Sequence, residues 1–312
     1  MKTLLGLFFT LLWSSAAIAT KFGLYSTTPL ILATTRFLIA GGLLFLYVYL
    51  FNKKYPWPQS HEWRSLIVLG LLNTTIYLGA TFWALSYVSA GLFNLFVTTN
   101  PFLVAFLSYI WLKRKVSIQE WIGMIVAAIG LFIATWPSIT SSGVKINGLL
   151  ILGLGMVSMA VGSVYFKKIN LNLPSVVINT WQVSIGGVVL IPITYILEKD
   201  NYFLKLDYYL LGSLIWLVFI ISIGTMLLWF YLLKQDTVKA NNWLFMTPIF
   251  GYVLAAIFLN ESIKMFDIIA TIFVLIGLFL SGNIATYPKK FQNRIKRVSY
   301  KTDKHKNSKE LD

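Results

Sequence analysis

The stretch FNLFVTTNPFLVAFLSYIWL, residues 93–112, has a counterpart 147 residues later in ANNWLFMTPIFGYVLAAIFL, residues 240–259. Each stretch is apolar for about 20 residues, the length that a helix needs to cross the hydrocarbon layer of a membrane. The matched polar, proline and leucine positions are Asn94 and Asn241, Pro101 and Pro248, and Leu112 and Leu259. Such matches at one fixed offset are hard to obtain by chance among apolar helices, so the pair indicates an internal duplication.

The rest of the chain is equally apolar. Of its 312 residues 57% are hydrophobic and only 12% are charged, which is more apolar surface than one soluble core can bury. Long, continuously apolar stretches indicate helices, because irregular backbone is costly in lipid. The sequence therefore predicts an all-α membrane protein with ten transmembrane helices. We expect them near residues 3–20, 29–51, 65–85, 92–112, 118–136, 148–166, 176–197, 210–233, 241–259 and 266–286.

The same offset relates most of the two halves of the chain. It aligns Gly6 with Gly153 and Lys21 with Lys168, and it aligns Gly130-Leu131-Phe132 with the same three residue types 147 positions later. Each half holds five predicted helices, an odd number, so the second half is expected to be inverted in the membrane. The predicted units are a first repeat at 3–136, a second repeat at 148–286 and a basic cytoplasmic tail at 287–312. Transporters commonly use such inverted repeats, with the substrate between them.

The basic residues that give the net charge of +15 are placed along the chain as expected for a membrane protein, so the charge does not indicate a nucleic-acid partner. If both termini are cytoplasmic, 20 basic residues lie on the cytoplasmic side and 5 on the other, with Arg36 inside a helix. The basic tail either fixes this orientation or also contacts anionic lipid. The first helix resembles a secretory signal, with Lys2 before an apolar run and Ala17-Ile18-Ala19 after it. Cleavage there would leave nine spans, and its counterpart in the second half favours an uncleaved helix.

These features together resemble the EamA type of the drug/metabolite transporter superfamily. The resemblance rests on the runs Thr99-Asn100-Pro101-Phe102 and Met246-Thr247-Pro248, and on the later Gly-Leu pairs at Gly130 and Gly277. It covers about residues 3–286. It implies two repeats of five helices and transport of small molecules, with export of metabolites or amino acids favoured. The glutamate that follows the proline-containing helix in this family stands at Glu261, whereas the first repeat has Arg114.

Pro101 and Pro248 are candidate helix breaks at matching positions in the two halves. A proline inside a helix removes one backbone hydrogen bond and crowds the carbonyl four residues earlier. A matched pair of broken helices near mid-membrane points to a central binding site. The alternative is that both kinks only improve helix packing.

Polar side chains gather in the third, fourth and ninth predicted helices. The candidates for substrate contact among them are Asn73, Tyr77, Asn94, Thr98, Asn100 and Thr247. Hydrogen bonds between helices would explain any one of them without a ligand. As a group they favour a polar cavity in the membrane.

Two further side chains are candidates for substrate contact. Arg36 lies seven residues past Pro29, about 10 Å into its helix. A charge at that depth is costly and marks a functional residue, here an anchor for a substrate carboxylate or phosphate. Its alternatives are snorkelling to the surface or structural pairing. Trp13 lies well inside the first helix and either lines a pocket for an aromatic substrate or packs between helices.

Several groups that catalysis would need are missing from the predicted helices. The chain has no cysteine, and its two histidines, His61 and His305, lie outside the helices. We therefore expect no enzyme activity, metal or cofactor, and the sequence offers no obvious proton carrier. The function that the sequence favours is transport of small organic metabolites across a plasma or inner membrane. The alternative is a scaffold or sensor that does not transport. The expected partners are a small-molecule substrate and the lipid bilayer, with a homodimer left open.

Overall fold

The computed structural model describes residues 2–52, 54–113, 117–140, 146–169, 171–235 and 243–280. These residues are helical apart from their connections, and an isolated bridge between Thr27 and Leu204 is their one β contact. The basic tail predicted at 287–312 lies outside them. The elements are α1 (Lys2–Gly23), α2 (Pro29–Phe45), η1 (Leu46–Phe51), α3 (Ser60–Leu69), η2 (Gly70–Leu78), α4 (Gly79–Ala84), α5 (Ala90–Val97), α6 (Asn100–Leu112), α7 (Ile118–Thr140), α8 (Ile146–Ile169), α9 (Ser175–Glu198), α10 (Tyr208–Ile215), η3 (Trp216–Thr225), α11 (Met226–Gln235), η4 (Leu244–Met246), α13 (Thr247–Leu259) and α14 (Met265–Leu280).

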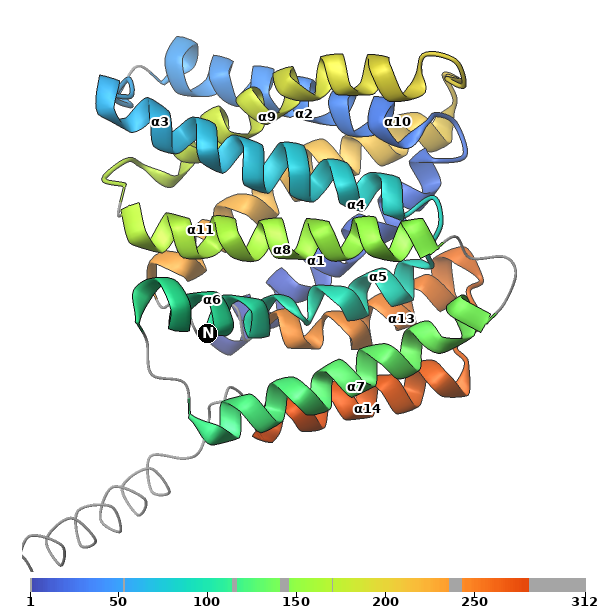
Figure 1. The fold of residues 1–312 in the computed structure, drawn as a ribbon. Helices are drawn as coiled ribbons and strands as arrows, with labels where there is room; N and C mark the ends of the chain where they lie inside the picture. Colours follow the sequence, from blue (N-terminus) through green and yellow to red (C-terminus); the bar gives the residue numbers. More distant parts are fainter. Residues whose placement is uncertain are drawn as a thin grey trace, which may run out of the picture.

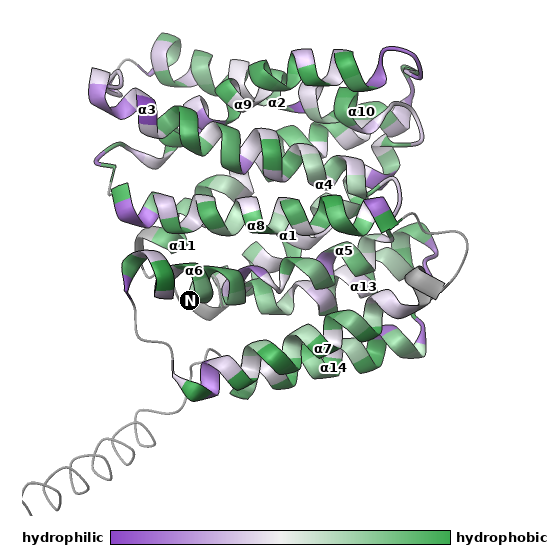
Figure 2. Ribbon diagram, in the orientation of Figure 1, coloured by the Kyte–Doolittle hydropathy of each residue, from purple (hydrophilic) through white to green (hydrophobic). Residues whose placement is uncertain are grey.

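The described helices have the length and hydropathy of a multi-pass membrane protein. Eight are long and apolar enough to cross a bilayer, and two shorter apolar helices follow at Leu244–Leu259 and Met265–Gly277. Their sides are mostly hydrophobic, whereas polar residues gather at their ends (Figure 2). Residues 241–242 and 281–286 of the last two predicted helices lie outside the described part, so these two helices are described over Leu244–Leu259 and Met265–Leu280.

Helices far apart in the sequence pack in pairs. The helix α2 packs along α9, and α7 packs along α14 at one side of the bundle (Figure 1). Between these pairs α1 contacts both α10–η3 and α13. The first helix of the chain is therefore central and contacts elements from residues 208–259.

Two unusual backbone features recur 147 residues apart. The segments η2 and η3 are π-helical, and adding 147 to the bounds of η2 gives residues 217–225, which lie within η3. Lys113 and Asn260 end α6 and α13 in the left-handed conformation, with φ of 51° and 53°. A wide π-helical turn is rare and frequently marks a functional site.

The two candidate prolines stand at helix starts, not inside continuous helices. Pro101 lies in the first turn of α6, after α5 has ended at Val97, and Pro248 lies in the first turn of α13, after the short 3₁₀ segment η4. A first-turn residue has no intrahelical partner for its N–H, so proline costs little there. The regular α-helix is thus interrupted just before each proline.

The close packing of α7 against α14 predicts opposite effects for two glycine substitutions. A Cβ on Gly277 would lie 2.5 Å from the carbonyl oxygen of Gly123, whereas a Cβ on Gly42 would meet nothing within 4 Å. We expect Gly277→Ala to lower the melting temperature of the purified protein by roughly 2–6 °C. The control, Gly42→Ala, should leave it unchanged or raise it, because alanine favours a helix by about 1 kcal/mol over glycine. Equal melting temperatures for the two variants would contradict this packing.

Candidate functional site

A narrow cavity lies in the middle of the bundle, between two hydrophobic clusters. The space open to the centres of water-sized molecules is about 80 Å³, enough for a few waters. The walls come from α1, α2, η2, α4, α5, α8, α9, η3 and α11. The candidates that the structure brings together here are Trp13, Arg36, Asn73 and Tyr77.

Arg36 supplies the positive charge of this cavity. Its side chain comes from the middle of α2 and is only 3% exposed. The guanidinium Nε donates to the hydroxyl of Ser222 at 2.9 Å, and the guanidinium carbon lies 4.9 Å and 5.4 Å from the ring centroids of Phe37 and Phe82. Both rings present a partial negative charge to the cation. Arg36 therefore points into the protein and does not snorkel to the surface.

The position of Ser222 depends on the π-helical turn of η3. The Asn179 side-chain amide donates to the Ser222 carbonyl at 2.9 Å, while the Ser222 hydroxyl accepts from Arg36. A widened turn makes such a carbonyl available to a neighbouring helix. The chain Asn179–Ser222–Arg36 thus connects α9, η3 and α2.

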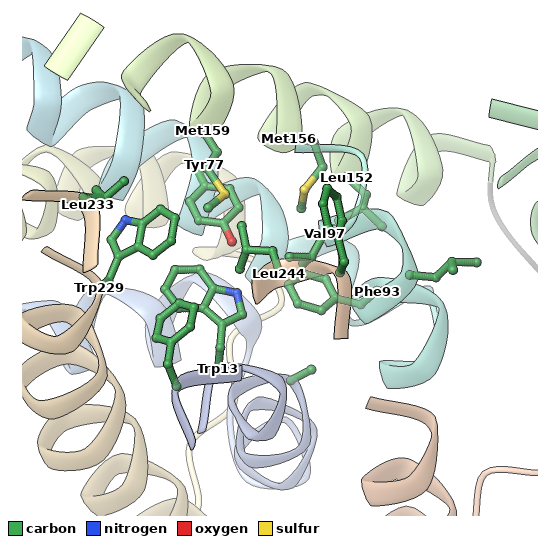
Figure 3. Packing of buried hydrophobic residues seen from close by; sticks show 14 of the residues in the cluster. Trp13, Tyr77, Phe93, Val97, Leu152, Met156, Met159, Trp229, Leu233 and Leu244 are labelled. Atoms are coloured by element: carbon green, nitrogen blue, oxygen red, sulfur yellow. The ribbon is translucent and has the colours of Figure 1, made fainter. Parts of the chain in front are cut away.

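The opposite wall carries neutral polar groups from η2. The Asn73 amide donates to the Gln182 side-chain oxygen at 2.9 Å, and both residues line the cavity. Helix α8 passes close to this pair, since a Cβ on Gly162 would lie 2.1 Å from the Asn73 side-chain oxygen. Tyr77 is 4% exposed and directs its hydroxyl toward the same space as Trp13 and Trp229 (Figure 3).

Two tryptophans, Trp13 and Trp229, line one end of the cavity, and Phe9 packs against both of them. Trp229 stacks on Phe9 with ring centroids 5.3 Å apart, and Trp13 lies 5.3 Å from Phe9 and 5.8 Å from Trp229. Trp13 and Trp229 approach from α1 and α11, while Met159 of α8 lies across from them (Figure 3). This end offers flat apolar faces to a ligand.

The other sequence candidates lie outside the cavity wall, in the contact between α1, α5 and α13. The Asn94 amide donates to the carbonyls of Ala90 and Ser14, and the Thr247 hydroxyl donates to the Asn94 carbonyl at 3.0 Å. Thr98 donates to the Leu95 carbonyl within its own turn. Asn100 is fully buried where α6 begins. Such bonds satisfy the backbone where helices are interrupted and hold the helices together.

Among the wall residues that sequence reasoning did not select are Gln182, Ser222 and Phe82, which contact Asn73 or Arg36. Gln182 carried a usable signal, because it is a polar residue in the middle of an apolar helix. Ser222 and Phe82 carried none, since a small residue and an aromatic residue are ordinary in membrane helices.

Two carboxylates connect helix ends that are far apart in the sequence. Glu198 accepts from the backbone N–H groups of Leu30 and Ile31 at 2.8 Å and 3.0 Å, at the start of α2. Glu261 accepts from those of Ala90 and Gly91 at 2.9 Å and 3.2 Å, at the start of α5. A carboxylate at a helix N-terminus satisfies free N–H groups and interacts favourably with the helix dipole. These bonds link the start of α2 to the end of α9, and the start of α5 to the segment after α13.

A multi-pass helical membrane protein with a central, mixed polar and aromatic cavity has the architecture of a solute carrier. The sequence model of the EamA-like transporter family matches residues 1–136 and 146–283. The chain belongs to this family, within the drug/metabolite transporter superfamily. The family consists of membrane transporters, not enzymes.

Known proteins agree with this assignment. An uncharacterized transporter of Synechocystis, sll0355, is 29% identical over 89% of this chain and 88% of its own length. The uncharacterized transporter YvbV of Bacillus subtilis is 29% identical over 83% of this chain and 84% of its own, and protein PecM of Dickeya dadantii is 25% identical over 89% and 91%. A solved crystal structure with 18% identity covers 89% of this chain and 95% of its own at a TM-score of 0.64, which shows a shared fold.

Because Arg36 is buried, we expect that replacing its side chain does not destabilise the protein in the absence of substrate. A buried guanidinium costs about 2.5–3.5 kcal/mol in a membrane helix, so an apolar side chain of similar length relieves this cost. We expect Arg36→Met to unfold at the same temperature as the parent protein or higher, with exposed Arg64→Met as the control. A fall of more than roughly 5 °C would show that Arg36 holds the helices together.

Proposed function

We propose that this protein exports small organic metabolites, of the amino-acid or drug-like class, by alternating access of the central cavity to the two sides of the membrane. The observation that carries the proposal is the composition of the wall. Trp13, Arg36 and Asn73 come from the first half of the chain, and Gln182 and Trp229 come from the second. A site between two halves can open to either side when one half rocks against the other. Export is the direction that the family resemblance favours.

The proposal includes ten membrane spans in two inverted repeats, 3–136 and 148–286. The matching offset of η2 and η3 supports it, as do the matching left-handed residues Lys113 and Asn260. The pairing of α2 with α9 and of α7 with α14 also supports it, because each pair joins helices of the same rank in the two halves. Unusual backbone at equivalent positions is the expected result of duplicating one five-helix unit.

The proposed function predicts saturable flux that depends on the cavity. Purified protein in liposomes should move at least one compound of a labelled amino-acid and metabolite panel. Gly162→Ala should reduce that flux about tenfold, because the new Cβ displaces Asn73 from its bond with Gln182. Gly153→Ala, on the same helix with nothing within 4 Å, should transport normally.

Absence of flux across a broad panel, with both variants folded in size-exclusion chromatography, would instead support a scaffold or sensor. Equal loss of flux in the two glycine variants would show that α8 tolerates no substitution at either position. It would contradict the assignment of the flux to the cavity.

The proposed orientation, with both termini in the cytoplasm of a plasma membrane, can be tested without first removing native thiols, because the chain has no cysteine. Asn172 and Asn201 are exposed beyond the two ends of α9. In intact cells a membrane-impermeant maleimide should label Asn201→Cys and should label Asn172→Cys only after permeabilisation. The reverse pattern would place the termini outside.

A further inference from the structure

The charge of the central cavity is unbalanced. Arg36 is buried in its wall, and no aspartate or glutamate stands among the described residues of that wall. The guanidinium has five N–H donors, of which Nε donates to Ser222. The other four find no hydrogen-bond partner among the described residues. The titratable side chain that interacts with the guanidinium is Tyr77, which is neutral in its ordinary state.

A membrane protein rarely keeps such a charge without a partner. Buried charges are normally paired, because removing an ion from water costs several kcal/mol. Interaction with the rings of Phe37 and Phe82 offsets part of this cost but supplies no negative charge. The missing partner is therefore to be expected in the ligand, where a carboxylate can accept two parallel N–H bonds from one guanidinium.

We infer that the cavity binds organic anions, specifically monocarboxylates with a flat apolar body, in preference to zwitterions and cations. This inference rests on the proposed function and narrows its substrate class from amino acids and drug-like metabolites to organic anions, so that free amino acids are disfavoured. The carboxylate would meet Arg36, and the apolar body would lie against Trp13 and Trp229. Tyr77 also lines the cavity and directs its hydroxyl toward the space beside Trp13 and Trp229 (Figure 3).

The aromatic end of the cavity favours a particular shape for the apolar part of the ligand. The rings of Trp13 and Trp229, which line this end, have centroids 5.8 Å apart and planes inclined by 46°, so they present flat aromatic surfaces in two orientations. Aromatic rings favour stacked or edge-to-face contacts with another ring. An aromatic or planar body therefore gains more from this end than a flexible aliphatic chain of similar length.

Zwitterions are disfavoured because the described residues of the wall include no carboxylate that could pair with an ammonium group. An ammonium needs acceptors for three N–H bonds, and a carboxylate supplies the strongest of them. The Gln182 side-chain oxygen already accepts from Asn73, and Arg36 repels a second cation in the same low-dielectric space. An amino acid bound here would bury an ammonium group with poor compensation.

Three compounds that differ only in charged groups test this inference. They are 3-phenylpropionate, an anion; phenylalanine, which adds an ammonium group to it; and phenethylamine, which retains the ring and the ammonium group alone. Binding to the purified full-length protein is measured by competition against radiolabelled 3-phenylpropionate and by direct binding of each labelled compound, so leakage through a bilayer plays no part. We expect 3-phenylpropionate to bind at least about tenfold more tightly than the other two.

Two substitutions then assign the preference to named residues. Arg36→Gln should weaken 3-phenylpropionate binding about 30-fold or more, and Arg36→Lys should restore only part of it, because lysine lacks the two-pronged geometry. Trp13→Leu should weaken 3-phenylpropionate several-fold while changing binding of hexanoate, an aliphatic anion, less. Unchanged binding in Arg36→Gln, with the variant folded in size-exclusion chromatography, would overturn the role of Arg36.

The outcomes separate this inference from the proposed function. Tighter binding of phenylalanine or phenethylamine than of 3-phenylpropionate would overturn the anion preference and leave the transport proposal intact. A second outcome would also overturn the anion preference alone. In that outcome the protein shows saturable flux of another compound but binds no organic anion in a panel of aromatic and aliphatic carboxylates. Absence of flux for every compound would instead remove the transport proposal itself.

Discussion

Hydrocarbon offers no hydrogen bonds, so every interruption of a membrane helix must be satisfied by the protein itself. Among the described residues, such interruptions include those between Val97 and Asn100 and between Trp243 and Thr247, and the π-helical segments η1, η2 and η3. The first two are held by short-range and interhelical bonds of Asn94, Thr98 and Thr247. The segments η2 and η3 instead carry residues of the cavity wall. Part of the site thus lies where the backbone departs from regular α-helix, whereas Trp13 and Arg36 project from the regular helices α1 and α2.

Helix ends in this bundle are connected by two kinds of chemistry. The carboxylates of Glu198 and Glu261 accept N–H bonds from the first turns of α2 and α5. Near the start of α9, Trp181 donates to the Tyr49 hydroxyl at 2.8 Å within a group of aromatic rings that includes Trp57 and Trp63. The position matching Glu261 in the first half is Arg114, which lies outside the described residues. The carboxylate contact made by Glu261 is therefore not matched by a carboxylate at the corresponding position of the first half.

The sequence predicted the helical membrane class from hydropathy, because about 20 apolar residues in succession have one main structural solution in lipid. It also identified Arg36, Trp13, Asn73 and Tyr77, which the structure brings to one cavity. It could not separate them from Asn94 and Thr247, because a polar residue that faces a cavity and one that bonds a neighbouring helix look the same in a single sequence. The π-helical turns were equally out of reach, since they arise from packing between helices.

The central claim is that one cavity between the two halves becomes accessible from both sides of the membrane. A single cysteine at Ser163, on the cavity wall, tests it most directly in oriented proteoliposomes with a membrane-impermeant thiol reagent. The account predicts slow modification from either side, and slower modification from both when a transported compound is present. Modification from one side alone, whether or not that compound is added, would contradict alternating access.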